Sequence, residues 1–360
     1  MKALILPLAA ITLLAAPIDG SAQQTSLERL PPEQFDVAPP TDRVSGNPGK
    51  MKIQQTGCRA LPTARTRRRI VDVAVQEWGF FGFSIVDETL VARQAANPGG
   101  RPSAGQPGSG PANTRRRFRR LDAGESERVA ASIGGYWAVT PGGDWILKKQ
   151  NEAWNGPGGV ASRWRNPWSA AFVSWVMCEG GLGDSSQFQR AIAHHTYIDQ
   201  AIRARDRNNV ASAFVAYDIG EAAIEPGDLL CRGSRPAYRN LEERRRQMGV
   251  GARTHCDLVV GVDESRERIF AIGGNVRGSV SLKLLPAVLE EGKRLRPQSQ
   301  SASRGRRAVF AHLKLRAEPI EPDALGNSPT VKALTCTAGL PAPSLLAARN
   351  LAAAGIAGNC

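Results

Sequence analysis

Apolar side chains recur at helical spacing in several stretches of the first part of the chain. Between residues 66 and 79 they run from Ile70 to Trp78, behind a cationic run at 67–69. This spacing predicts an amphipathic helix. The same reasoning predicts three further helices, over residues 125–137, from about Pro167 onward, and over 187–203.

After Pro226 the pattern changes to short apolar runs separated by polar turns. The predicted strands are DLLCR, HCDLVVGV, RIFAIGG and SVSLKLL. Helices followed by paired strands indicate an α+β fold, and not an alternating βαβ one. We expect the N-terminal helices to pack on a small antiparallel sheet.

The chain begins with a short apolar segment that has the features of an export signal. Lys2 precedes an uncharged run from Ala3 to Ala16, and small residues follow up to Ala22. The run is shorter than the about 20 residues that span a bilayer. We therefore expect a cleaved signal peptide at 1–22 and a periplasmic or secreted protein, with an uncleaved anchor as the alternative. The rest of the sequence contains no run apolar enough for a transmembrane helix.

Three segments are too polar or too rich in Pro, Gly or Ala to belong to the expected domain at 65–316. Residues 23–64 are predicted to form a flexible lead, and 317–360 an Ala/Pro-rich, loosely packed tail. Residues 94–120 form a Gly/Pro/Ser-rich insertion that ends in a basic run. We interpret the insertion as a solvated loop, and a tether to an anionic polymer is the alternative.

The composition is that of a globular protein. Of 360 residues, 42% are apolar and 22% charged, and 47 Lys and Arg against 33 Asp and Glu give a net charge of +14. These values exclude a collagen-like or coiled-coil chain. The charge favours an anionic partner, such as a cell wall, a membrane surface or a nucleic acid.

Six cysteines, an even number, predict disulfides in an oxidising compartment. None of them has the CxxC spacing of a zinc or redox site, so we expect no metal and no cofactor. We expect Cys336 to pair with Cys360, because both lie in the same terminal segment. The remaining connectivity stays open among Cys58, Cys178, Cys231 and Cys256.

The segment NPWSAAFVSWVMCEGG at 166–181 contains the first candidate for chemistry. Asn166 is expected to cap a helix, Pro167 to occupy its first position, and Gly180 to end it. Ser169 then lies in the first turn, where free backbone N–H groups gather and can stabilise an oxyanion. The alternative is a small polar residue in a capped turn.

A predicted hairpin brings a histidine close to an amide side chain. The polar loop DESRE at 263–267 separates two apolar runs. If the hairpin is centred on Ser265, paired residues sum to 530, and Asn275 lies opposite His255. An amide can hold an imidazole in one tautomer, as in a Cys-His-Asn arrangement. Asp257 shares the face of His255 and is the second candidate for this role. A histidine at a sheet edge with no catalytic role is the alternative.

Two further groups of residues are candidates for the wall of a substrate cleft. His194 and Tyr197 share one face of the predicted helix at 187–203, and His195 lies on the next face. Trp168 directly precedes Ser169. A surface helix with an ordinary aromatic contact is the alternative. Asp228 is expected in a turn, and His312 is expected to be structural.

Together these residues resemble a known group of enzymes. The W-S-A-A-F-V helix start, PGDLL at 226–230, His255 opening a strand, and IGGN at 272–275 occur in one order. This order is similar to that of papain-like cell-wall hydrolases of the CHAP and NlpC type, and more closely to the bacterial domain of unknown function 2272, over about residues 65–315. The resemblance implies a papain-like fold and cleavage of amide bonds in peptidoglycan. It also implies Ser169 as nucleophile, His255 as base and Asn275 as orienting residue.

The sequence departs from these enzymes at the nucleophile, where they have Cys and this chain has Ser169. A thiol at a helix N-terminus ionises readily, whereas a hydroxyl needs a general base. Each of the other cysteines fits the position less well than Ser169, because Cys178 lies on the opposite face of the helix, Cys256 points away from His255, and Cys231 is expected in a disulfide.

Three functions remain open at this point. The first is an exported peptidoglycan peptidase or amidase. The second is a catalytically inactive envelope protein that binds cell-wall glycan or a protein partner through the same groove. The third is nucleic-acid binding through Arg-rich clusters at 115–120, 243–246 and 304–307, which an exported protein is not expected to perform. The sequence does not indicate an oligomeric state.

Overall fold

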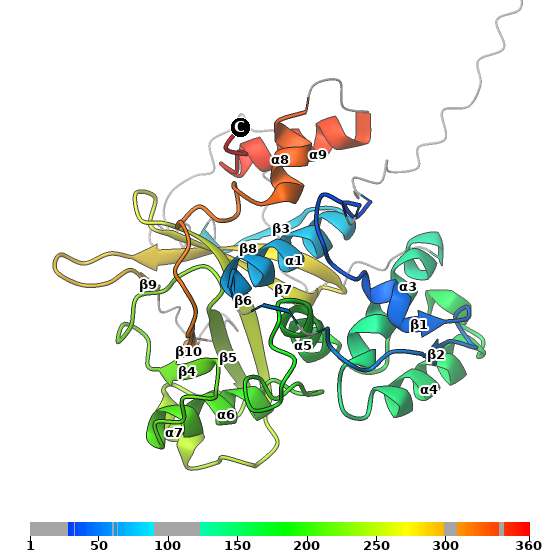
Figure 1. Cartoon of the computed structure of the whole chain (residues 1–360), viewed down its shortest axis with the longest axis horizontal. Helices are drawn as coiled ribbons and strands as arrows, with labels where there is room; N and C mark the ends of the chain where they lie inside the picture. The colour runs from blue at the N-terminus through cyan, green and yellow to red at the C-terminus, as the bar shows by residue number, and fades with distance from the viewer. Residues whose placement is uncertain are drawn as a thin grey trace, which may run out of the picture.

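The computed structural model describes residues 28–89, 123–298, 308–337 and 342–360, apart from residues 32, 60 and 63. The predicted signal peptide at 1–22 and the insertion at 94–120 lie outside the described residues. The described chain is an α+β arrangement in which helices pack against one large sheet (Figure 1).

The sheet is mixed and not purely antiparallel as predicted. Its strand order is β3-β8-β7-β6-β5-β10-β4, with β9 paired to β8. The strands are β3 (Ser84–Asp87), β4 (Phe214–Tyr217), β5 (Leu229–Arg235), β6 (Arg253–Asp263), β7 (Arg268–Val276), β8 (Ser279–Val288), β9 (Arg296–Pro297) and β10 (Val309–Leu315). The correction concerns β3, which pairs parallel to β8. Its four residues SIVD carry too short an apolar pattern to predict a strand.

The β6–β7 hairpin has the predicted register where it approaches His255. Leu258 pairs with Ile272, so the numbers sum to 530. Near the turn the sum is 531, because Asp263 pairs with Arg268 and the loop holds only residues 264–267. A bulge between Val259 and Gly261 corrects this offset. The loop was therefore predicted one residue too long, and the bulge cancels the error.

The helices form around the sheet in the order of the sequence. They are η1 (Pro40–Arg43), α1 (Thr66–Phe80), α3 (Ala123–Ala138), α4 (Gly143–Trp154), η2 (Gly159–Ala161), α5 (Ser169–Glu179), α6 (His195–Asp206), α7 (Leu241–Arg245), α8 (Pro329–Thr335) and α9 (Ala342–Ala353). The first two predicted helices agree with α1 and α3 within two residues. The fourth was placed too early, since residues 187–194 are not helical and α6 begins at His195.

Helix α5 lies in the centre of the molecule and contacts α1, α3, β6 and β7 (Figure 1). All eleven of its residues are buried. A helix that is apolar on all sides is stable only when neighbours cover every face. The ends of α5 are consequently fixed by the surrounding core, and Ser169 at its first position is fixed with them.

The lead at 23–64 and the segment from 317 onward are packed in their described parts, contrary to the prediction. The two-stranded ribbon β1 (Val44–Ser45) and β2 (Lys52–Ile53) lies beside α3 and α4. The side chain of Asn151 on α4 holds the backbone of Met51, donating to its carbonyl oxygen and accepting from its N–H. At the other end α8 packs on α1 with Val331 and Leu334 buried. Both segments bury apolar side chains, which the Pro- and Ala-rich composition concealed.

All six cysteines are paired. The disulfides are Cys58–Cys178, Cys231–Cys256 and Cys336–Cys360, which confirms the pair predicted from the sequence. Cys58–Cys178 joins the N-terminal segment to α5 across a sequence separation of 120 residues. Cys231–Cys256 joins β5 to β6 next to His255. No helix among the described residues is long and apolar enough to cross a membrane.

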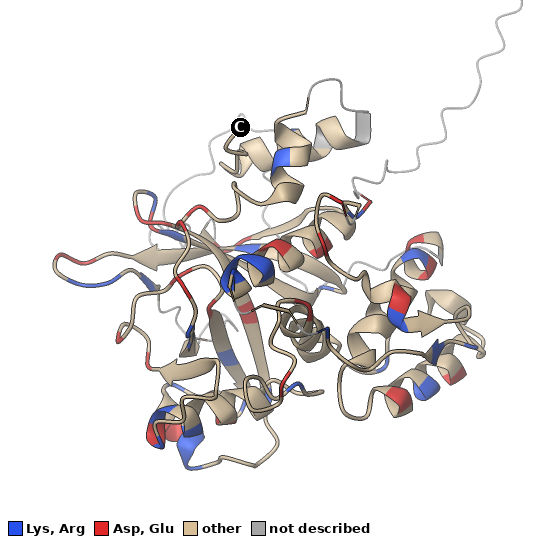
Figure 2. Cartoon of the chain, in the orientation of Figure 1, with Lys and Arg blue, Asp and Glu red and all other residues tan. Residues whose placement is uncertain are grey.

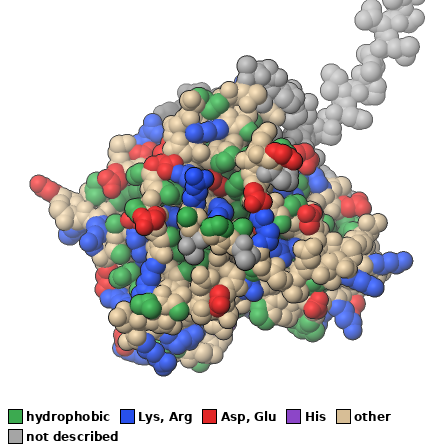
Figure 3. Space-filling view, in the orientation of Figure 1, with side chains coloured by type: hydrophobic (Ala, Val, Ile, Leu, Met, Phe, Trp, Pro, Cys, Tyr) green, Lys and Arg blue, Asp and Glu red, His purple; other side chains and the backbone are tan. Residues whose placement is uncertain are grey.

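Positive and negative side chains alternate over the described surface (Figure 2). Of the Arg-rich cluster at 243–246, Arg244 pairs with Asp199 at 2.7 Å and Arg245 with Asp206 at 2.8 Å. The face drawn in Figure 3 also shows blue and red side chains interspersed. The clusters at 115–120 and 304–307 lie outside the described residues, so the described surface gives the nucleic-acid hypothesis no support.

Disulfide removal tests how the N-terminal segment is held. A disulfide stabilises mainly by restricting the unfolded chain, and more for a longer loop. Because the separations are 120 and 24 residues, Cys58→Ala/Cys178→Ala should lower the free energy of unfolding by roughly 1–2 kcal/mol more than Cys336→Ala/Cys360→Ala. Urea denaturation of the two double variants measures the difference, and an equal or larger loss in the second variant contradicts the expectation.

Candidate active site

The structure brings Ser169 and His255 together. The Ser169 Oγ is 2.8 Å from the His255 Nδ1, although the two residues are 86 positions apart in the chain. Helix α5 begins at Ser169 with Trp168 as its N-cap residue. The prediction that Asn166 caps the helix and that Pro167 opens it was therefore wrong by two residues. The expectation that Ser169 lies in the first turn is met.

Asp257, the second candidate from the sequence, binds the far side of the imidazole. The His255 Nε2 lies 2.8 Å from the Asp257 Oδ1. Both residues are on β6 two positions apart, so they project from the same face of the sheet. The side chain of His255 is 27% exposed and that of Asp257 1%. A hydroxyl, an imidazole and a buried carboxylate thus stand in line, as in serine hydrolases.

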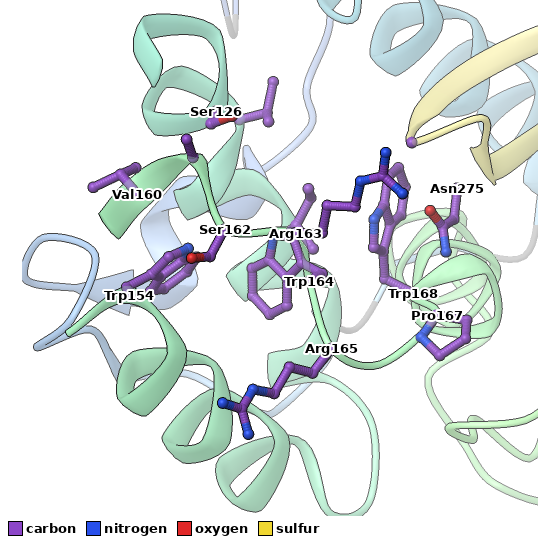
Figure 4. Close-up of a pocket in the computed structure, with 14 residues that line it drawn as sticks. Ser126, Trp154, Val160, Ser162, Arg163, Trp164, Arg165, Pro167, Trp168 and Asn275 are labelled. Carbon is purple, nitrogen blue, oxygen red and sulfur yellow. The ribbon is translucent and has the colours of Figure 1, made fainter. Parts of the chain in front are cut away.

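Asn275 does not contact His255, which corrects the first choice for the orienting residue. The pairing of β7 with β8 is irregular between Gly273 and Val276. Asn275 there adopts a φ of 56°, in the left-handed region. This interrupts the alternation of the strand, so register counting no longer predicts where the side chain points. The Asn275 amide lines a pocket with Pro167 and Trp168 instead (Figure 4).

Lys283 on β8 completes the site and was not identified from the sequence. Its Nζ lies 2.7 Å from the Asp257 carboxylate and 3.2 Å from the His255 Nε2. Only 7% of the residue is exposed. The available signal was a lone cation in the apolar run SVSLKLL, because Lys is almost never buried without a partner.

The buried charges around His255 shift the pKa values in directions that suit a general base. Burial by itself raises the pKa of Asp257, but Lys283 and His255 outweigh it and hold this pKa well below its usual range. For His255, burial and the Lys283 cation lower the pKa, and they outweigh the opposing effect of Asp257. Asp257 is therefore ionised and His255 is neutral at neutral pH, able to accept a proton.

His194, predicted as a cleft residue, contacts the Ser169 hydroxyl directly. Its Nε2 lies 2.9 Å from the Ser169 Oγ. Its Nδ1 accepts from the Cys256 N–H at 3.3 Å and also contacts the Tyr197 hydroxyl. Burial lowers the pKa of His194 well below its usual value, so the ring is neutral. Because an N–H occupies Nδ1 from outside, the ring proton is on Nε2 and points at Ser169.

The hydrogen bonds around Ser169 thereby acquire a direction. The Oγ accepts from the His194 Nε2–H, so the Ser169 proton is directed to the unprotonated Nδ1 of His255. The Nε2–H of His255 then donates to Asp257. The chain His194, Ser169, His255, Asp257 runs one way, and it leaves His255 in the tautomer that can remove the Ser169 proton.

Two glycines on β7 make room for this arrangement. A Cβ at Gly273 would collide with the Asp257 Oδ1 and stand 3.1 Å from the His255 Nε2. A Cβ at Gly274 would stand 2.5 Å from the Cβ of Phe172 on α5. Strand β7 lies between β6 and β8, so a side chain at Gly273 would occupy the space where Lys283 reaches Asp257.

The remaining predicted residues lie outside this chain of contacts. His195 binds the backbone of Ala252, with 3.3 Å from its Nδ1 to the carbonyl oxygen. Tyr197 reaches the site only through His194. A second histidine–carboxylate pair, His312 and Asp228, is 0% exposed and also bound to Arg67. Because no solute can reach it, this pair is structural, as expected for His312. The described residues contain no cluster of side chains able to hold a metal ion.

A pocket opens beside the site (Figure 4). It has a volume of about 390 Å³ and is lined by residues of α3, α4, η2 and the 162–168 loop, with Asn275 and Gly278 from the other side. Of the predicted cleft residues, Trp168 lines it.

Comparison with protein families agrees with one part of the resemblance. The model of a family described as an uncharacterized protein conserved in bacteria (DUF2272) matches residues 126–315, more than half of the chain. The chain belongs to this family. The DUF2272 region contains Ser169, His194, His255, Asp257 and Lys283. Searches of the curated proteins and of the solved structures find no match.

The pKa of His255 can be tested by substituting Lys283. His255 should titrate below the usual value of 6.5, and loss of the nearby cation in Lys283→Met should raise this pKa, because the positive charge disfavours a second one. Lys283→Arg keeps the charge and is the control. NMR titration of selectively labelled histidine measures the effect, since the chain has only four histidines. An unchanged or lower His255 pKa in Lys283→Met contradicts the argument.

The space over Gly273 can be tested separately. Gly273→Ala should reduce the free energy of unfolding by about 1–3 kcal/mol, the usual cost of overpacking, and should break the His255–Asp257 contact. Gly251→Ala is the matched control, because a Cβ at Gly251 meets nothing within 4 Å. Urea denaturation compares the variants. Equal stability of the two would show that the sheet accommodates a side chain at Gly273.

Proposed function

We propose that this protein is an exported hydrolase that cleaves an amide bond of peptidoglycan, with Ser169 as nucleophile and a papain-like arrangement of helix and sheet. The observation that carries the proposal is the 2.8 Å contact between the Ser169 Oγ and the His255 Nδ1. Its support includes Asp257 on the far side of His255 and a set of disulfides compatible with an extracytoplasmic protein. Peptidoglycan as the substrate rests on the resemblance to cell-wall hydrolases.

In the proposed reaction the Ser169 Oγ attacks the carbonyl carbon while the His255 Nδ1 takes the hydroxyl proton. The imidazolium is stabilised by the Asp257 carboxylate. When the tetrahedral intermediate breaks down, the C–N bond is cleaved and His255 returns the proton to the leaving amine. Water, deprotonated by His255, then hydrolyses the Ser169 ester.

The carbonyl oxygen becomes negative during this reaction and needs donors. The first intrahelical bond of α5 runs from the Phe172 N–H to the Trp168 carbonyl. The preceding N–H groups at the start of the helix therefore have no intrahelical acceptor. They point out of the positive end of the helix dipole, where they favour an anion. The His194 Nε2–H lies beside them.

A serine is a suitable nucleophile in this surrounding, although the resembled enzymes use cysteine. A hydroxyl does not ionise by itself near neutral pH and depends on a base in direct contact. His255 is held neutral and correctly oriented for this task. The dipole of α5 would suffice for a thiol, whereas the Asp257–Lys283 pair serves a base that must carry a full positive charge during the reaction.

One observation favours a second candidate function. The residue Ser169 is only 7% exposed, and its hydroxyl is engaged by two histidines. A hydroxyl held in this way could be purely structural. The protein would then be an inactive envelope protein that binds glycan or a protein partner through the same groove.

Digestion of purified peptidoglycan distinguishes the two candidates. The wild type should release soluble fragments, and Ser169→Ala and His255→Ala should each reduce the rate by about 1,000-fold or more. Ser169→Cys should retain activity, because a thiol meets the same base and dipole. Ser185→Ala, an exposed serine, is the matched control and should digest like the wild type.

Digestion that survives both Ser169→Ala and His255→Ala would eliminate the assigned nucleophile and base. Saturable binding to peptidoglycan without any released product, in the wild type and in Ser169→Cys, would instead establish the binding protein.

A further inference from the structure

The pocket beside Ser169 has a mixed lining. Trp154 and Trp164 lie on one side and Trp168 on the other, with Arg163 and Asn275 near the Trp168 side in the view of Figure 4. The rings of Trp154 and Trp164 contact each other edge to face, with centroids 5.1 Å apart. The volume of about 390 Å³ lies within the range of small-molecule sites, roughly 300–1,000 Å³.

The pocket adjoins the reacting groups on both sides of the chain. Trp168 is the residue before Ser169, and its ring packs on Tyr136 and Phe81, which fixes it. Asn275 follows Gly273 and Gly274, the two residues that pass against His255, Asp257 and Phe172. A group seated in the pocket is therefore held next to the bond that Ser169 attacks.

The lining is amphipathic in a way that selects the ligand. The indole rings offer flat apolar faces, while Ser162, Arg163 and Asn275 place hydrogen-bonding groups on the same wall. The Asn275 amide has no hydrogen-bond partner among the described residues. A purely apolar acyl chain would leave such groups unpaired, at a cost for each polar group that loses water.

We propose that this pocket binds a sugar ring of the substrate. A pyranose has C–H faces that pack on indole rings and a rim of hydroxyls that pairs with amide, hydroxyl and guanidinium groups, so it matches both parts of the lining. The proposal rests on the proposed function and names its substrate more closely. Ser169 then acts near the junction between sugar and peptide, and not within a peptide stretch remote from the glycan.

Binding can be measured without turnover in the Ser169→Ala background. The probes are N-acetylmuramoyl-L-alanyl-D-isoglutamine and the same dipeptide without the sugar, followed by isothermal titration calorimetry. The sugar-bearing probe should bind at least about tenfold more tightly than the dipeptide, a difference of about 1.4 kcal/mol.

Substitutions in the pocket assign the binding to its wall. Trp164→Ala should weaken binding of the sugar-bearing probe by about tenfold, whereas Trp145→Ala should not, because Trp145 is 52% exposed on α4 and lies outside the pocket. If Trp164→Ala fails to fold, Ala161→Phe fills the pocket from η2 and should have the same effect. Its matched control is Ala352→Phe on the exposed face of α9.

The outcomes separate this proposal from the proposed function. Equal affinity for both probes, no binding of the sugar-bearing probe, or equal losses in Trp164→Ala and Trp145→Ala overturn the sugar site even if the wild type digests peptidoglycan. Tight binding that depends on Trp164 and Ala161 supports the sugar site even if no digestion occurs, and in that case only the hydrolase assignment falls.

Discussion

A carboxylate that is removed from water remains ionised only where cations and hydrogen-bond donors surround it, and Asp257 meets this condition between Lys283 and His255. The three groups come from β6 and β8, with β7 between them. Gly273 on β7 has no side chain, so the groups can meet across it. The charge of Asp257 fixes the tautomer of His255, and His255 in turn takes up the proton of Ser169. The direction of the whole chain of hydrogen bonds depends on this one buried pair.

The core holds Ser169 in place more rigidly than its own helix cap does. Trp168 provides no side-chain hydrogen bond to the start of α5, so the usual capping interaction is missing. Instead α5 is buried on all faces and joined to the N-terminal segment through Cys58–Cys178. On the facing side Cys231–Cys256 ties β5 to β6 beside His255. Both partners of the Ser169–His255 contact are thus restrained by covalent links close to them.

His194 gives the site a feature beyond a three-residue arrangement. It donates to the hydroxyl that His255 must deprotonate, and its own orientation is set by the backbone of Cys256, the residue after His255. One short stretch of β6 therefore positions the base, its carboxylate and the second histidine. This common support explains how two imidazoles can contact one hydroxyl in complementary roles, one as donor and one as acceptor.

The sequence by itself determined the features that depend on local periodicity. Apolar spacing located α1 and α3, the polar turn at 263–267 located the β6–β7 hairpin, and strand alternation placed Asp257 on the face of His255. Only the tertiary structure decided the rest. An irregularity in β7 turned Asn275 into the pocket, Lys283 reached Asp257 from two strands away, and the packing of α5 brought Ser169 to His255. These contacts join segments far apart in the chain, and their geometry follows from how the whole core fills space, which no local pattern records.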